Sequence, residues 1–201
     1  MADTHNNWTS DTALKALKDG NLRFASGNPT HPNSDALTRD NLAAHGQAPM
    51  AAILSCSDSR APVEAIFDLG FGDIFSVRVA GAVPGVDELG SLEYAVAHLG
   101  TPLIVVLGHT KCGAVTAAVN GASEEGNLAE LLAKLHPVVQ LVATVPQEER
   151  VFAAIFKSVQ IFRDRIPELS PQIQALVREN KVKIISAVYD IDTGKVTFEE
   201  P

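Results

Sequence analysis

The sequence feature that most constrains the fold is an uninterrupted apolar run, Leu103-Ile104-Val105-Val106-Leu107. Five apolar residues without polar alternation are typical of a strand buried on both faces, as in a parallel sheet with helices above and below it. Other strand-like segments alternate with segments of helical periodicity, which predicts an α/β fold with a mainly parallel β-sheet flanked by α-helices. The further strands are expected at 51–54, 73–77, 182–189 and 196–198, and the helices at 11–25, 40–45, 89–99, 147–165 and 171–180. The pattern is also helical from Gly113 onward, where the leucines at 128, 131, 132 and 135 follow helical spacing.

Residues 1–49 are expected to form an N-terminal helical arm of a single domain that takes in all 201 residues. The main helix of the arm, 11–25, has Leu14, Leu17 and Leu22 as apolar anchors, and a glycine and a proline soon after it mark its end. The chain contains no repeat, low-complexity tract or long linker that would suggest a second domain.

The composition excludes several classes of partner. The formal net charge is −8 and there is no basic run, which argues against binding to nucleic acid or to anionic membranes. No segment approaches the roughly 20 apolar residues of a membrane-spanning helix. The polar N-terminus lacks the apolar core of a signal peptide, and two cysteines make a poor disulfide framework. We therefore expect a cytoplasmic protein with reduced cysteines.

Two short polar runs follow two of the predicted strands: CSDSR at 56–60 and HTKC at 109–112. In open α/β sheets, functional sites form beyond the carboxyl ends of the strands, where both runs would lie. Zinc binds cysteine sulfur and histidine nitrogen in tetrahedral geometry. If the two strand ends lie side by side, Cys56, His109 and Cys112 converge and supply three zinc ligands.

Asp58 and Arg60 belong to the first of these runs and suggest how a fourth coordination position is controlled. A guanidinium matches a carboxylate through two hydrogen bonds, so Arg60 can hold Asp58 away from the metal and leave the position to water. If that pair breaks, Asp58 can become the fourth ligand in a closed state. This switch is a hypothesis from residue types and spacing.

The two cysteines also allow other interpretations. Cysteine is among the most buried residue types, so either thiol can be an ordinary packed side chain. A disulfide is a second alternative, and a Cys–His nucleophilic pair is a third. The nucleophilic pair leaves unexplained why a second cysteine lies three residues from the histidine. A His-x-x-Cys pair alone is a weak signal, but its combination with Cys-x-Asp-x-Arg is a strong one.

With these motifs in place, the chain resembles the β-class carbonic anhydrases over nearly its whole length. Such a set of motifs in this order is highly specific for the superfamily. The segments that carry the resemblance are LKDGNLRF at 17–24, CSDSR at 56–60, GSLEYAV at 90–96, GHTKCGA at 108–114 and VYDIDTGKV at 188–196.

The resemblance implies a zinc lyase, carbonate dehydratase, with zinc on Cys56, His109 and Cys112 and a catalytic dyad of Asp58 and Arg60. The implied reaction is the reversible hydration of CO2 to bicarbonate by zinc-bound hydroxide, because the metal lowers the pKa of its bound water.

The resemblance also implies a substrate pocket and an assembly. Gln47, nine residues before the first cysteine, stands where the plant-type branch has a pocket glutamine. By the same matching, Phe75 and Tyr94 would line the pocket, and the backbone N–H of Gly113 would face the substrate. The assembly would be a homodimer or homotetramer in which the leading helix lies over the partner.

One stretch departs from the family pattern and leaves an alternative activity open. The usual sequence after the second strand is Arg-Asn-Ala-Gly-Asn or Arg-Val-Ala-Gly-Asn, whereas this chain has RVAGA at 78–82, followed by Pro84. Ala82 lacks the usual amide, and the change is expected near the pocket wall. The alternative is a hydrolase of carbonyl sulfide or carbon disulfide on the same scaffold. A metal-binding or redox-sensing protein without catalysis would need a fourth permanent ligand, and the Asp-x-Arg dyad argues against it.

Overall fold

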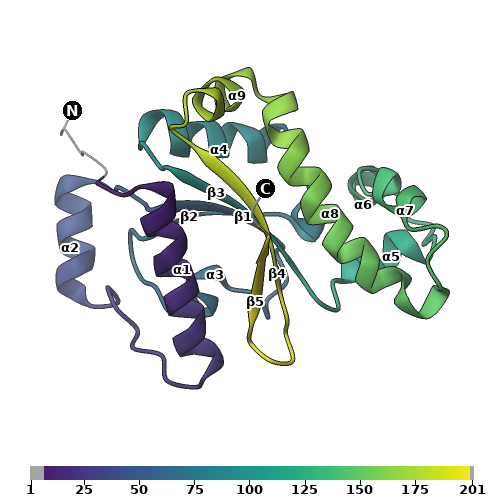
Figure 1. The fold of residues 1–201 in the computed structure, drawn as a ribbon, viewed down its shortest axis with the longest axis horizontal. Coiled ribbons are helices and arrows are strands. Elements are labelled where there is room, and N and C mark those ends of the chain that lie inside the picture. The colour runs from purple at the N-terminus through teal and green to yellow at the C-terminus, as the bar shows by residue number, and fades with distance from the viewer. Residues whose placement is uncertain (1–6, 200–201) are drawn as a thin grey trace.

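The computed structural model describes residues 7–199 and has a five-stranded sheet at its centre (Figure 1). The strand order is β2-β1-β3-β4-β5, in which the first four strands are parallel and β5 is antiparallel to β4. The predicted α/β class with a mainly parallel sheet is therefore confirmed. The strands are β1 (Ala51–Ser55), β2 (Ile74–Arg78), β3 (Leu103–His109), β4 (Lys183–Tyr189) and β5 (Val196–Glu199).

Helices cover both faces of the sheet, as the unbroken apolar strands require. Every residue of β1 is buried, and β3 is buried from Leu103 to Leu107. One face packs against α4, α5, α8 and α9, and the other packs against α1 and α3. The helices are α1 (Ser10–Ala25), α2 (Ala36–His45), α3 (Val63–Ile66), α4 (Val86–His98), α5 (Gly113–Val119), α6 (Gly126–Ala133), α7 (His136–Leu141), α8 (Gln147–Leu169) and α9 (Pro171–Arg178).

The register aligns the carboxyl ends of the strands at one edge of the sheet. Ser55, the last residue of β1, lies beside Arg78 of β2 and beside Leu107 of β3. His109, the last residue of β3, lies beside Tyr189 of β4. The loops that follow β1 and β3 therefore start at neighbouring points, which the sequence could only assume.

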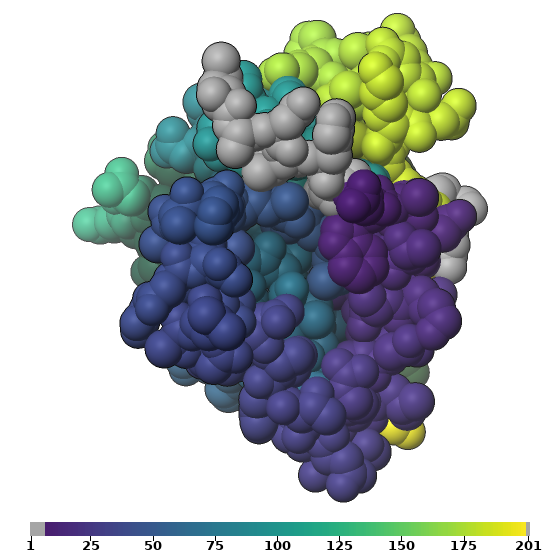
Figure 2. Space-filling model, turned by 90° about the vertical axis from the view of Figure 1, so that its left-hand side faces the viewer, coloured from purple at the N-terminus to yellow at the C-terminus, as the bar shows by residue number. Residues whose placement is uncertain are grey.

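The N-terminal helices differ in how they contact the sheet. Leu14 and Leu17 of α1 are buried in the core of their own chain, whereas Leu22, predicted to be a third anchor, is 70 % exposed. No residue of α2 is buried, although every residue of this helix is described. Figure 2 shows the hollow between α1 and α2, with later residues of the chain at its floor.

Asp68, in the turn after α3, ties the N-terminal segment to the sheet. Its buried carboxylate pairs with Arg23 of α1 and accepts hydrogen bonds from Thr30 and from the backbone N–H of His31. Burial acts to raise the pKa of Asp68, but these hydrogen bonds outweigh it and hold the pKa below its usual value. Asp68 thus anchors the loop between α1 and α2 to the turn after α3.

Within residues 7–199, no helix combines the length and the apolar character needed to span a membrane.

Candidate metal centre

Cys56, His109 and Cys112 converge at the carboxyl edge of the sheet. Their ligand atoms all lie within 4.8 Å of one another, and the two sulfur atoms are 4.0 Å apart. Cys56 follows β1, His109 ends β3, and Cys112 directly precedes α5. All three side chains are buried, so the convergence predicted from the two motifs is confirmed.

The second motif bends sharply so that its cysteine faces its histidine. Lys111 takes a positive φ of 58°, a left-handed conformation that turns the chain between strand and helix. The hydroxyl of Thr116, one turn into α5, donates to the carbonyl of Cys112 at 2.8 Å. The turn and the helix start together aim the Cys112 sulfur back at His109.

His109 presents one particular nitrogen to the cluster. Its Nδ1 lies 2.9 Å from the carbonyl oxygen of Thr110, so this nitrogen carries the hydrogen and donates it. Among the residues that the structure describes, the buried Nε2 finds no hydrogen-bond partner. An imidazole fixed in this way has its Nε2 lone pair free for a metal ion, and such second partners are typical of metal-binding histidines.

The donor set fits zinc. Two sulfurs, each about 2.3 Å from a tetrahedral zinc, stand about 3.8 Å apart, and the observed sulfur separation is 4.0 Å. The thiols also interact with each other, because a hydrogen bond from Cys112 lowers the pKa of Cys56, while the same bond raises the pKa of Cys112. A buried thiolate beside an imidazole nitrogen with its lone pair available is the environment that a divalent cation stabilises.

Asp58 and Arg60 form the pair that the sequence predicted. Arg60 donates from Nε to Asp58 Oδ1 at 3.0 Å and from Nη2 to Oδ2 at 2.7 Å, and its backbone N–H donates to Oδ1 at 2.9 Å. These bonds hold the pKa of Asp58 well below its usual range. Asp58 Oδ2 lies 3.8 Å from His109 Nε2, so the paired carboxylate stands beside the three ligand atoms.

The other predicted site residues fall into two groups. Gly113 is exposed and begins α5 next to Cys112. Phe75 lies beside Ala52 near the amino ends of the strands, and its ring centroid is 6.1 Å from that of Tyr94. Gln47 is exposed and precedes β1. The structure therefore does not bring Gln47, Phe75 and Tyr94 to the metal cluster of the same chain.

The two residues that depart from the family pattern, Ala82 and Pro84, lie in different parts of the structure. Ala82 is buried in a short 3₁₀ turn, η1 (Ala80–Ala82), and has a positive φ of 54°. The preceding residue, Gly81, donates its N–H to the Cys56 sulfur, so this turn lies beside the metal cluster. Pro84 instead lines a hollow of about 510 Å³ bounded by α4, α6, α7 and α8.

One functional candidate escaped the sequence analysis. Arg78, the last residue of β2, donates to the backbone carbonyls of both Cys56 and Asp58. The available signal was an arginine directly after a predicted strand, in the RVAGA stretch whose departure from the family pattern was noted only at Ala82.

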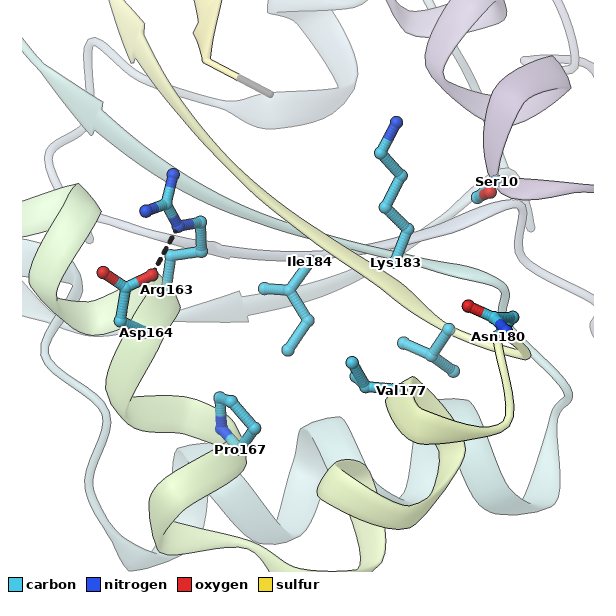
Figure 3. A pocket seen from close by; sticks show the side chains of 9 residues that line it. Ser10, Arg163, Asp164, Pro167, Val177, Asn180, Lys183 and Ile184 are labelled. Carbon is cyan, nitrogen blue, oxygen red and sulfur yellow. Dashed lines mark hydrogen bonds and ion pairs between the residues drawn. The ribbon is translucent and has the colours of Figure 1, made fainter. Parts of the chain in front are cut away.

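A second hollow, of about 550 Å³, lies between α8, α9 and the start of β4 (Figure 3). The ion pair of Arg163 and Asp164 stands at its wall, with a closest distance of 2.7 Å. Lys183, also in its lining, pairs with Leu103, the first residue of β3. This hollow is thus at the amino ends of the strands, opposite to the metal cluster.

Comparisons with known proteins agree with the geometry. The family described as "Carbonic anhydrase" matches residues 51–196. Carbonic anhydrase 2 of Mycobacterium tuberculosis is 39% identical over 197 residues, covering 94% of this chain and 92% of its own. Carbonic anhydrase of Pseudomonas aeruginosa is 30% identical over 194 residues, covering 91% and 86%.

A solved structure from Sordaria macrospora, one of two tetrameric β-carbonic anhydrases, superimposes with a TM-score of 0.73. It is 27% identical and covers 94% of this chain and 96% of its own. Sequence, fold and the Cys-His-Cys cluster therefore agree: the chain belongs to the β-class carbonic anhydrase family.

Proposed function

We propose that this protein catalyses the reversible hydration of CO2 to bicarbonate as a zinc enzyme. The observation that carries the proposal is the buried cluster of two sulfurs, 4.0 Å apart, facing the Nε2 of His109, which has no hydrogen-bond partner among residues 7–199. The paired Asp58 and Arg60 beside it distinguish the site from a purely structural metal site.

Zinc would be held by Cys56, His109 and Cys112. When bound, zinc acts as a Lewis acid that lowers the pKa of a water molecule from 15.7 to about 7, which supplies a nucleophile near neutral pH. The protein keeps the His109 ring in one orientation through the carbonyl of Thr110. It also keeps both sulfurs out of bulk solvent, because Cys56 and Cys112 are buried.

The carboxylate of Asp58 has one acceptor position left for a further hydrogen bond. A carboxylate oxygen has about two acceptor positions. Oδ1 already accepts from Nε and from the backbone N–H of Arg60, whereas Oδ2 accepts only Nη2 among these donors. The remaining position on Oδ2 lies on the atom nearest to His109 Nε2. There the carboxylate can accept a hydrogen bond from the attacking water and orient it toward the substrate carbon.

The substrate pocket would be completed by a second copy of the chain. Gly113 stands beside the cluster, but Gln47, Phe75 and Tyr94 lie toward the other ends of the strands of their own subunit. Tyr94 is 49% exposed, which leaves it free to contact another subunit. These placements, and the tetrameric relatives from Sordaria macrospora, support a homodimer or homotetramer in which these three side chains serve the pocket of a partner.

The arm and the sheet would form a single domain. Leu14 and Leu17 pack into the same apolar cluster as strands β1 and β3, which supports one cooperative unit for residues 1–201 with residues 1–49 as its arm.

The deciding experiment combines metal analysis with a stopped-flow assay of CO2 hydration on the purified protein. We expect about one zinc per chain and rapid hydration that a chelator abolishes. Sulfide release from carbonyl sulfide and carbon disulfide should be measured on the same sample. Protein with full zinc that releases sulfide but does not hydrate CO2 would replace this proposal with the hydrolase, which Ala82 keeps as the alternative.

A further inference from the structure

Arg78 contacts both functional residues of the first metal loop through their backbone. Its Nε donates to the carbonyl of Cys56 at 3.1 Å, and its Nη2 donates to the carbonyl of Asp58 at 2.6 Å. One planar guanidinium thus spans the carbonyls of a metal-binding residue and of the catalytic carboxylate. Because Arg78 lies directly beside Ser55 in the sheet, its own position is set by strand pairing.

The chain after Arg78 continues along the same loop. The N–H of Ser57 donates to the carbonyl of Val79 at 3.3 Å, and the N–H of Gly81 donates to the Cys56 sulfur at 3.3 Å. Gly81 has a φ of +72°, and a Cβ there would lie 3.3 Å from the Cβ of Ala114. Residues 78–81 therefore contact the loop at its carbonyls, at an N–H and at the sulfur itself.

The two arginines of the site hold different parts of Asp58. Arg60 pairs with the carboxylate, and Arg78 binds the backbone carbonyl. Arg60 comes from the same loop as Asp58, and it links that loop to the second metal loop at the carbonyl of Lys111 rather than to a strand of the sheet. Arg78 comes from β2, so it can fix the loop relative to the sheet. Only a guanidinium offers two donors in one rigid plane for two carbonyls.

We propose that Arg78 is a positioning residue for the reaction, which holds Cys56 and Asp58 at a fixed separation from each other and from β2. The inference rests on the proposed function for its effect on turnover. Arg78 touches no reacting atom, and it acts through the backbone of the two residues that do. A displacement of about 1 Å in such a group costs about a hundredfold in rate.

The test compares Arg78→Ala and Arg78→Lys with Arg178→Ala, an exposed arginine at the end of α9. For Arg78→Ala we expect kcat to fall about tenfold to hundredfold with little change in KM. Zinc content and thermal midpoint should stay near those of the wild type. The kcat of Arg78→Lys should lie between the values for the wild type and Arg78→Ala, because an ammonium group can satisfy one carbonyl well but not both. Arg178→Ala should match the wild type.

Chemical rescue separates positioning from folding. Arg78 is exposed, so added ethylguanidinium can enter the space that Arg78→Ala leaves, and it should restore part of kcat. Ethylammonium at the same concentration should restore less. A loss of kcat that follows a loss of zinc or of thermal midpoint, without rescue, would overturn the proposal.

A second measurement does not depend on CO2. Transfer of zinc to a chromophoric chelator should be faster from Arg78→Ala than from the wild type, since the Cys56 loop opens more often, and unchanged in Arg178→Ala. Equal transfer rates for Arg78→Ala and wild type would overturn the proposal. If the wild type binds zinc but hydrates no CO2, the proposed function fails, while the transfer rates still decide the role of Arg78.

Discussion

The two loops that build the metal centre are anchored in different ways. The first, residues 56–60, carries one ligand and the catalytic dyad, and Arg78 holds it from β2. The second, residues 109–112, carries two ligands and is held by the turn between β4 and β5. Arg60 joins the loops, because its Nη2 also donates to the carbonyl of Lys111 at 3.2 Å.

The two loops differ in the part of the fold that anchors them. The N–H of Thr110 donates to the carbonyl of Tyr189 at 2.9 Å, and the Thr110 hydroxyl accepts from the N–H of Ile191 at 3.0 Å. Lys111 pairs with Asp192 at 2.6 Å. The loop with two ligands is thus part of the sheet and its hairpin. In the first loop, the carbonyls of Cys56 and Asp58 are held by one side chain, Arg78, so we expect that contact to control turnover.

Removal of a zinc ligand should have the largest effect on zinc content and CO2 hydration. The size of this effect should be the same for a ligand of the first loop and for one of the second. Cys56→Ala and Cys112→Ala each leave two ligands, too few for a stable zinc site. We expect each variant to lose most of its zinc and about a thousandfold or more in CO2 hydration, because unassisted water has a pKa of about 15.7. Metal analysis and stopped-flow rates measure this. Stoichiometric zinc in either variant would contradict the assigned ligand role.

Asp58→Asn should separate chemistry from metal binding within the first loop. The amide keeps the shape but loses the charge that Arg60 binds, and it presents an NH₂ group where one carboxylate oxygen accepted, so the attacking water is no longer oriented. We expect full zinc content with kcat lowered about a hundredfold. Asp164→Asn, a change to an exposed carboxylate on α8, is the matched control. Full activity of Asp58→Asn would remove this carboxylate from the mechanism.

Asp68→Asn should lower the free energy of unfolding and should leave both metal loops unchanged. Its carboxylate is buried and paired with Arg23, and loss of one partner of such a pair costs about 3 kcal/mol. Because the folded-state pKa lies below the usual 3.8, this contribution is complete above that pH and is lost as pH falls through the folded-state value.

Chemical denaturation of wild type and Asp68→Asn at a series of pH values measures the difference directly. The gap in the free energy of unfolding should be constant from pH 8 to about pH 5 and should narrow below about pH 4. A gap that widens on acidification would show that the carboxylate is not stabilised in the ionised form. Per-zinc activity should stay unchanged, since Asp68 lies outside both metal loops.

Lys111→Met should have the smallest effect and tests the anchors of the second loop. Lys111 and Asp192 are 59% and 61% exposed, and such surface ion pairs contribute about 0–1 kcal/mol. We expect the free energy of unfolding to change by less than about 1 kcal/mol and the rate of zinc transfer to stay near that of the wild type. A large acceleration of zinc loss would mean that this ion pair, and not the Thr110 contacts, holds the loop.

Local pattern was sufficient for most elements but not for their ends. The apolar run at Leu103–Leu107 correctly indicated a strand buried on both faces. The second helix was expected at 40–45 but begins at Ala36, because Asp35 caps it by accepting from the N–H of Thr38. The helix expected to end at Arg165 continues to Leu169 with Pro167 inside it, and the N–H of Ser170 still donates to the carbonyl of Ile166.

Amphipathic periodicity also misplaced one side chain. Leu22 was expected to pack with Leu14 and Leu17, but it is exposed beside a hollow formed with β5. The buried face of α1 is the face that contacts α3 and the sheet. Leu22 lies further along the helix, on a side that points away from both.

The residue types and spacing in CSDSR and HTKC were enough to specify the ligands and the dyad, because the chemistry of zinc and of a guanidinium–carboxylate pair is local. Folding in three dimensions settled the rest. The strand order β2-β1-β3 places Arg78 against the first loop and leaves Gln47 and Phe75 away from their own cluster. Those relations join residues far apart in the chain, and they depend on which strands pair and which faces pack, so no short pattern encodes them.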